Sequence, residues 1–244
     1  PVLHVLALGM GLLRLAIPLA PLAAARYAPT AVAVGVASLL YGAIVALRQT
    51  RPRALVAYAS LSHMGYVVVG AFTLTAVGAH GAILQVLSHG FAVCGLFLLV
   101  GAMERRAGDD ASSVTALAAR APRLAVMLML FVLASLALPL TSGFSAEFLV
   151  LLGAFERGLA DFDAGRSTAL TVAVLASAGV VLGATYMLRF ARARLYGAVG
   201  AAAPRIADLG VRELAAFGAL VVAILWLGLW PSTTMRRAQP AVDA

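Results

Sequence analysis

Apolar runs of close to 20 residues follow one another along almost the whole chain, and short polar segments between them carry most of the arginines. A helix rises about 1.5 Å per residue, so roughly 20 residues cross a hydrocarbon layer about 30 Å thick. Only 11% of the 244 residues are charged and 63% are hydrophobic, which is far too apolar for an average soluble domain. The chain is therefore predicted to be an integral membrane protein.

The runs are rich in leucine, valine and alanine, and they lack the two-residue alternation of membrane strands. We therefore expect an all-α fold, a polytopic transmembrane bundle of seven or eight spans with broken helices. Residues 1–244 would form a single membrane domain. The eight runs are Val2–Ala20, Thr30–Leu47, Ala54–Thr75, Gly78–Met103, Leu124–Leu140, Gly143–Phe155, Ala169–Phe190 and Glu213–Trp230.

The formal net charge of +8 would suggest a nucleic-acid partner in a soluble protein. Here the arginines lie mainly between apolar runs, where they meet lipid headgroups, so the expected partner is the bilayer and not nucleic acid. All 18 basic residues are arginine, and lysine is absent. The single cysteine, Cys94, lies inside an apolar run, so no disulfide or cysteine metal site can form within the chain.

Three arginine clusters fall on one face of the membrane if each run crosses it once. They are Arg48, Arg51 and Arg53; Arg105, Arg106, Arg120 and Arg123; and Arg236 with Arg237. Cytoplasmic loops are enriched in basic residues, so that face is predicted to be cytoplasmic. The same count puts a further group on the opposite face, which contains Arg189, Arg192, Arg194 and Arg205.

Of the ten acidic residues, only Glu147 lies inside an apolar run. An ionisable group at bilayer depth costs about 2.5 kcal/mol or more, so one that is retained there is a functional candidate. Pro139 and Gly143 precede it and predict a break in the helix. We interpret Glu147 as a proton or cation carrier. In the alternative, Ser142 caps a helix N-terminus and the helix dipole favours Glu147 near the first turn.

Two histidines, His63 and His89, also lie inside apolar runs, and each follows a serine, Ser62 or Ser88. Histidine titrates near neutral pH, which suits it to proton relay, and Tyr58 is a further hydroxyl on such a path. The two runs are neighbours in sequence, so we expect the imidazole rings to approach each other. In the alternative, each histidine only bonds a neighbouring helix.

Four strings carry a family resemblance: RALVAYASLSHMGY at 53–66, GAILQVLSHG at 81–90, GLFLLVG at 95–101 and TSGFSAEF at 141–148. Together they resemble the antiporter-like M subunit of bacterial proton-pumping NADH:quinone oxidoreductase, respiratory complex I, whose mitochondrial counterpart is subunit 4. The resemblance covers nearly the whole chain but only the C-terminal portion of the family. It implies that the chain is a fragment or a shortened paralogue.

The resemblance implies a multi-pass subunit of the bacterial inner (cytoplasmic) membrane, which translocates protons in step with electron transfer. Glu147 would be the terminal carboxylate, with His63 and His89 as relay members. NADH, FMN, iron–sulfur clusters and quinone are implied for partner subunits and not for this chain, which has no nucleotide loop or cluster motif. Other membrane subunits are the expected partners.

Two positions depart from the family pattern, because Leu6 and Arg53 stand where the family has lysines. Leucine carries no proton, and arginine stays protonated because its intrinsic pKa exceeds about 12. Arg53 would therefore polarise the path without loading a proton, or would simply snorkel at the interface. Two other functions remain open: a subunit of a multisubunit cation/proton antiporter, and a non-translocating structural remnant.

Overall fold

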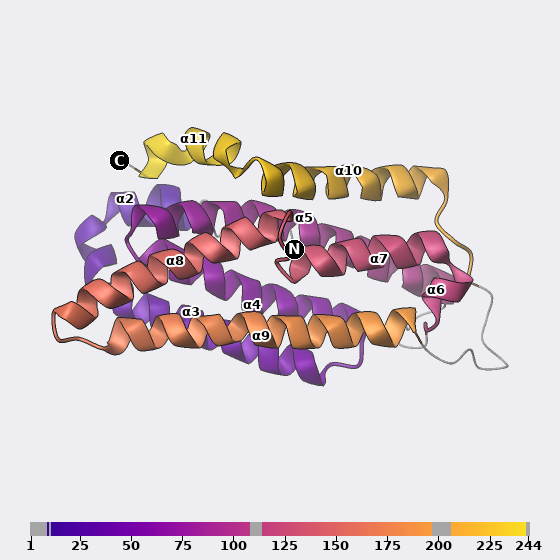
Figure 1. The fold of residues 1–244 in the computed structure, drawn as a ribbon, viewed down its shortest axis with the longest axis horizontal. Helices are drawn as coiled ribbons and strands as arrows, with labels where there is room; N and C mark the ends of the chain where they lie inside the picture. The colour runs from indigo at the N-terminus through magenta and orange to yellow at the C-terminus, as the bar shows by residue number, and fades with distance from the viewer. Residues whose placement is uncertain (1–8, 10, 108–113, 197–205, 243–244) are drawn as a thin grey trace.

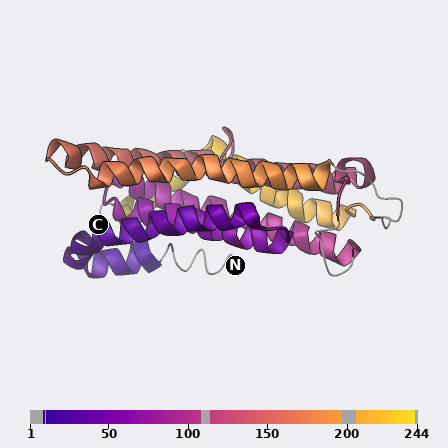
Figure 2. The same ribbon diagram turned by 90° about the horizontal axis from the view of Figure 1, so that it is seen from below.

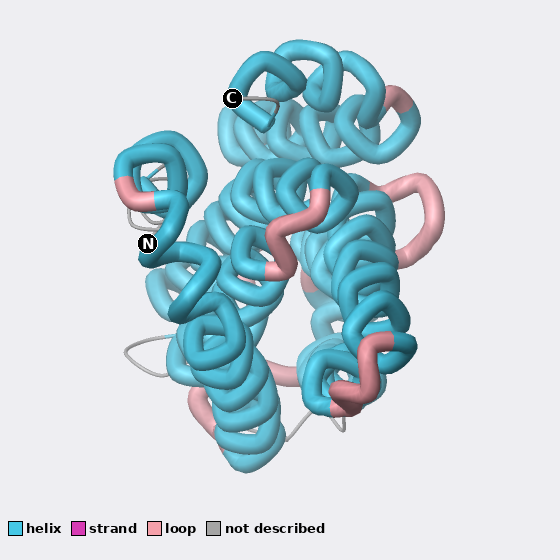
Figure 3. The backbone as a smooth tube through the Cα atoms, turned by 90° about the vertical axis from the view of Figure 1, so that its left-hand side faces the viewer, coloured by secondary structure: helices cyan, strands magenta, loops and turns pink. Residues whose placement is uncertain are grey.

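The computed structural model describes residues 9, 11–107, 114–196 and 206–242, apart from the side chains of 14 and 237–242. All regular structure in these residues is helical, as Figure 3 shows in a view from one end of the bundle. The elements are η1 (Leu12–Ala16), a π-helix, and the α-helices α2 (Ile17–Leu19), α3 (Pro21–Arg48), α4 (Pro52–Phe72), α5 (Ala76–Ala107), α6 (Leu117–Arg120), α7 (Pro122–Ser135), α8 (Ser142–Asp163), α9 (Thr168–Leu195), α10 (Val211–Leu229) and α11 (Pro231–Val242).

The predicted all-α membrane fold is confirmed. Within the described residues, the helices long and apolar enough to cross a membrane are α3, α4, α5, α9 and α10. They lie side by side along the long axis of the molecule (Figures 1 and 2). Residues 2–8 and 10 of the first predicted span, Val2–Ala20, lie outside the described residues, and residues 12–19 form η1 and α2.

Helices α7 and α8 together form one discontinuous helix. Figure 1 shows α8 continuing along the long axis from the point where α7 ends. The long helix α5 lies beside both of them, because Phe131 of α7 contacts Gly95 and Val150 of α8 contacts Gly81. As the chain advances from α7 into α8, its contacts move toward the beginning of α5, so the pair crosses the bundle once, antiparallel to α5.

The interruption between α7 and α8 confirms the predicted break. Pro139 has no N–H to donate to a helix, and proline also disfavours helical backbone at the residue before it. Ala137 and Leu140 adopt φ values of 51° and 79°, in the left-handed region that residues with a side chain rarely occupy. Gly228 of α10 packs directly on the Leu140 carbonyl, at a distance that leaves no room for a Cβ atom.

This discontinuous helix corrects the predicted order of crossings. The runs Leu124–Leu140 and Gly143–Phe155 are two halves of a single crossing and not two spans. The end of α9 therefore lies beside the end of α3, where Arg189 donates a hydrogen bond to the Leu47 carbonyl at 3.1 Å. The predicted placement of the arginines of α9 on the opposite face was wrong.

One end of the bundle collects most of the described arginines, and we call it the arginine-rich end. Helices α3, α5 and α9 end there and α4, α7 and α10 begin there, as the ion pairs Arg53–Glu104 and Arg106–Glu213 indicate. Helix α10 leaves this end, so α11, which carries Arg236 and Arg237, lies at the other end, contrary to the prediction. Arg205 lies outside the described residues. The arginines at the arginine-rich end are Arg48, Arg51, Arg53, Arg105, Arg106, Arg120, Arg123, Arg189, Arg192, Arg194 and Arg212.

Glycines bring α3 and α4 into close contact. A Cβ atom on Gly42 would lie 2.6 Å from the Ser62 nitrogen, and one on Gly65 would lie 2.5 Å from the Gly35 carbonyl oxygen. Small residues allow this approach in membrane bundles, where packing and not water exclusion drives association. The contact fixes α4, the helix that carries His63, against its neighbour.

Candidate functional site

A carboxylate and an imidazole meet in the interior of the bundle, just after the break in α7–α8. The Oε1 atom of Glu147 lies 3.1 Å from Nδ1 of His63, and both side chains are 8% exposed. Thr141 and not Ser142 occupies the N-cap position of α8, which places Glu147 in the second turn. The capping alternative is therefore wrong, and the prediction that Glu147 faces protein is confirmed.

The two histidines approach each other, as predicted, and their rings stack. The His63 and His89 ring centroids are 4.8 Å apart with an interplanar angle of 29°. The Nε2 atom of His89 lies 2.8 Å from the hydroxyl of Ser60, a residue one turn before His63 on α4. Glu147, His63, His89 and Ser60 thus lie in a row across helices α8, α4 and α5, with polar contacts at both ends and ring stacking between the two histidines, and we call this row the polar chain.

Gln85 contacts the centre of this chain. Its Nε2 atom lies 3.3 Å from Nδ1 of His63, the same nitrogen that faces Glu147. When Nδ1 carries a proton it donates to the Glu147 carboxylate, and when it does not, the amide of Gln85 can donate to its lone pair. Nδ1 of His63 therefore has a partner whether or not it carries a proton.

Of the three predicted supporting hydroxyls, those of Ser88 and Ser62 lie near the site and that of Tyr58 does not. Ser88 accepts a hydrogen bond from Ser142 at 2.8 Å, which ties α5 to the start of α8. Ser62 lines a small cavity of about 10 Å³ together with Glu147. Tyr58 is half-buried and packs in the apolar core, so the structure does not bring it into the polar chain.

Arg53 lies away from this site. Its Nε atom donates to Oε1 of Glu104 at 3.1 Å, and its side chain is 60% exposed at the arginine-rich end. Ten residues separate it from His63 on the same helix, a distance of roughly 15 Å. The histidine and not Arg53 is therefore the basic group next to Glu147. Leu6, the other departure from the family pattern, lies outside the described residues.

Sequence reasoning missed several neutral members of the site. Gln85 and Ser60 contact the histidines, and two buried tyrosines, Tyr66 and Tyr186, line the small cavity beside Glu147. The Tyr66 hydroxyl donates to the Ala176 carbonyl at 3.1 Å. Neutral polar residues are inexpensive in a membrane helix, so their presence in an apolar run gave no signal comparable to that of an ionisable group.

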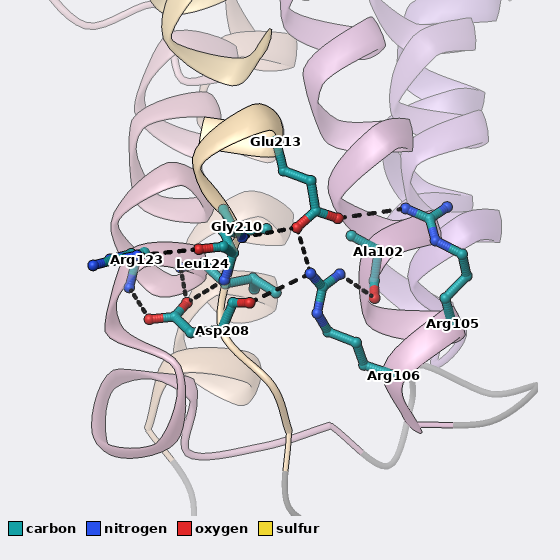
Figure 4. A network of polar contacts seen from close by, with 9 residues as sticks. Ala102, Arg105, Arg106, Arg123, Leu124, Asp208, Gly210 and Glu213 are labelled. Carbon is teal, nitrogen blue, oxygen red and sulfur yellow. Dashed lines mark hydrogen bonds and ion pairs between the residues drawn. The ribbon is translucent and has the colours of Figure 1, made fainter. Parts of the chain in front are cut away.

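A second polar cluster lies at the arginine-rich end, where the segment before α10 meets α7 (Figure 4). Asp208 accepts hydrogen bonds from the backbone N–H groups of Arg123, Leu124 and Leu209 at 2.8 to 3.0 Å. Partial burial raises the pKa of the Asp208 carboxyl, but these three hydrogen bonds lower it more, so the pKa lies below its ordinary value. Asp208 thus caps the N-terminus of α7 from a distant part of the chain.

Glu213 completes this cluster from the first turn of α10. Its carboxylate pairs with Arg106 and lies 3.9 Å from the guanidinium of Arg105, both at the end of α5 (Figure 4). It also accepts the N–H of Gly210, the N-cap residue of α10, at 3.1 Å. The cluster anchors the beginning of α10 to α5 and α7.

An apolar helical bundle with an interrupted helix and a buried carboxylate–imidazole pair has the features found in membrane proteins that move ions. The model of the family described as "NADH:quinone oxidoreductase/Mrp antiporter, TM" matches residues 3–162, and the chain belongs to this family.

Comparisons with individual proteins agree with this assignment. The chain is 36% identical over 236 residues to NADH-quinone oxidoreductase subunit M of Rhodobacter capsulatus, which covers 96% of this chain and 44% of that protein. A subunit of respiratory complex I from Thermus thermophilus superimposes with a TM-score of 0.85 and 33% identity, over 99% of this chain and 50% of that one. A chain of the Mrp complex from Dietzia shares the fold at a TM-score of 0.76 with 21% identity, over 89% of this chain and 47% of that one.

The chain spans less than half the length of the curated relatives that it matches, 44% in the Rickettsia prowazekii and Rhodobacter capsulatus proteins. The solved structures that it resembles are multi-subunit membrane complexes. The chain is therefore a membrane-embedded member of the family that corresponds to about half of a typical subunit.

Proposed function

We propose that the chain is the C-terminal part of an M-type subunit of NADH:quinone oxidoreductase, and that Glu147 carries protons through it in step with electron transfer elsewhere. The contact of Glu147 with His63 carries this proposal. A buried acid and base at hydrogen-bonding distance can exchange one proton without leaving a charge isolated in the bilayer. The match to subunit M and to complex I supports the coupling to quinone reduction.

In the proposed mechanism, the proton moves along the polar chain by small steps. Glu147 passes a proton to Nδ1 of His63, and Gln85 holds the ring when that proton is absent. Stacked rings exchange no proton directly, so in this mechanism one imidazole turns until a nitrogen of His63 faces a nitrogen of His89, which then passes the proton toward the Ser60 hydroxyl. The break between α7 and α8 frees backbone groups near Glu147, and these are tolerated in a membrane only where protein or a polar interior surrounds them.

We further propose that other membrane subunits surround the bundle, and that NADH, FMN, iron–sulfur clusters and quinone bind to partner subunits. The membrane would be the inner membrane of a bacterium. The arginine-rich end would face the cytoplasm, because basic residues accumulate on that side. With α7–α8 counted as one crossing, the described helices supply six spans, and the run Val2–Ala20 would add a seventh.

Glu147→Gln tests the proposal, because glutamine keeps the volume and the hydrogen-bonding capacity but cannot ionise. In the intact complex, reconstituted in vesicles, we expect proton pumping per electron to fall sharply while assembly and thermal stability change little. Glu156→Gln on the same helix is the matched control, since Glu156 is exposed. Unchanged pumping by Glu147→Gln would leave the chain as a structural subunit.

A subunit of a multisubunit cation/proton antiporter is the second candidate, favoured by the family shared with Mrp antiporters and by the likeness of fold to the Mrp complex. The two candidates differ in what drives the ion. Exchange of sodium for protons across vesicles, without NADH or quinone, would favour the antiporter, whereas transport that needs electron transfer favours the oxidoreductase.

A further inference from the structure

Tyr186 of α9 separates two cavities. The outer cavity has a volume of about 220 Å³ and opens at the arginine-rich end, where Gln49, Thr50 and Arg189 line it. The inner cavity, of about 10 Å³, contains the site of Glu147 and His63. Tyr186 is 1% exposed and lines both cavities, so its side chain is the wall between the outside and the polar chain.

The hydroxyl of Tyr186 points to the inner cavity. A Cβ atom built on Gly183, which lines that cavity, would lie 3.9 Å from it. The buried Tyr186 hydroxyl has the Ser62 hydroxyl beside it as a polar neighbour, and no other hydrogen-bond partner among the described residues. Nearly all buried hydroxyls in proteins are hydrogen-bonded, and a cavity of this size is at the lower limit for one water molecule. The hydroxyl therefore has bonding capacity available on the Glu147 side.

We propose that Tyr186 is a proton-relay residue that connects the outer cavity at the arginine-rich end to Glu147 and His63. This inference rests on the proposed function and names its route of proton access. A phenol is both donor and acceptor, so its oxygen can accept a proton that water delivers past the ring from the outer cavity while its own proton leaves toward Glu147. Rotation of the hydroxyl then restores the starting state, with no net charge left on the tyrosine.

The dimensions of the route favour protons over sodium. The inner cavity holds about one water molecule, so a sodium ion would have to shed nearly all of its hydration shell to pass. A proton needs no space of its own, because it is handed from oxygen to oxygen.

Two substitutions test the relay in the intact complex. Tyr186→Phe removes the hydroxyl and keeps the ring, with Tyr41→Phe on the exposed face of α3 as control. Gly183→Ala occupies part of the inner cavity and meets no atom nearer than 3.9 Å, with Gly218→Ala, which meets nothing within 4 Å, as control. The rate at which Glu147 is protonated, followed by its carboxyl infrared band after a pH jump, should fall about tenfold in both test variants and in neither control.

The outcomes separate the relay from the proposed function. If Glu147→Gln stops pumping while Tyr186→Phe and Gly183→Ala protonate Glu147 at the normal rate, the relay is refuted and the function of Glu147 stands. If Glu147→Gln pumps normally, the proposed function itself fails. If Tyr186→Phe does not assemble, Gly183→Ala decides, because its added methyl group meets only ordinary contacts; a normal rate in that variant overturns the relay.

Discussion

The contact of α5 with α8 predicts that one added methyl group, in Gly81→Ala, disturbs both stability and pumping. A Cβ atom on Gly81 would lie 2.5 Å from the Val150 nitrogen and 2.8 Å from the Leu149 carbonyl carbon. Both are backbone atoms, so no rotamer change relieves the clash. The α8 backbone has to retreat by roughly 1 Å to restore an ordinary contact of about 3.5 Å.

The displacement matters because Val150 lies one turn after Glu147. If α8 moves as a rigid body, a shift of about 1 Å lengthens the 3.1 Å contact between Glu147 and His63 toward 4 Å, beyond hydrogen-bonding range. Overpacking of this kind destabilises a protein by about 1 to 3 kcal/mol. We therefore expect Gly81→Ala to lower the thermal stability of the purified complex and to reduce proton pumping per electron.

Gly218→Ala is the matched control for this experiment, because a Cβ atom there meets nothing within 4 Å. In a helix this change is neutral or stabilises by up to about 1 kcal/mol, so the control should pump normally. A Gly81→Ala complex as stable and as active as the parent would refute the packing argument, since it would mean that α5 and α8 are not held at this separation.

Two further predictions concern the arginine-rich end. Arg53→Lys keeps a cation beside Glu104, and an exposed ion pair contributes at most about 1 kcal/mol, so pumping and stability should both remain near normal; a clear rise in pumping would instead mean that position 53 takes part in proton transfer. The pKa of Asp208 is lowered in the folded protein, so its stabilising effect is complete above its ordinary pKa of about 3.9 and is lost only as the pH falls through the lower, folded-state value. The protection factor for amide exchange at Leu124, which corrects for the change of the intrinsic rate with pH, should therefore stay high down to about pH 4 and fall in more acidic buffer, whereas Asp208→Asn should be less protected near neutral pH; equal protection in both proteins would contradict the capping role.

The ionisable centre of the site was predictable because so few charges occur in the apolar runs. Glu147, His63 and His89 stand out by the free energy that burying them requires. Their mutual contact followed from the adjacency of the runs that carry the histidines. Gln85 and Tyr186 could not be found this way, because a neutral polar residue in a membrane helix acquires a role only from what the neighbouring helices place opposite it.

The number of crossings was harder to predict than the helical fold. Pro139 marks an interruption, but sequence alone does not say whether the chain turns back after it or continues in the same direction. Counting two crossings there reversed every later helix, which is why the arginines of α9 and the position of α11 were assigned to the wrong ends. The decisive information is the tertiary contact of α5 with both α7 and α8, which pattern reasoning along one helix does not contain.

Helix α10 is held at both ends, and this gives it mechanical properties that a free transmembrane helix lacks. Glu213 fastens its beginning to Arg106, and Gly228, roughly 22 Å further along, rests on the carbonyl of Leu140 in the interrupted segment. A single helix absorbs a change in bilayer thickness by tilting. A helix held by contacts near both ends cannot tilt without straining one of those contacts. Thinning or thickening of the surrounding lipid therefore puts strain on the backbone next to Glu147.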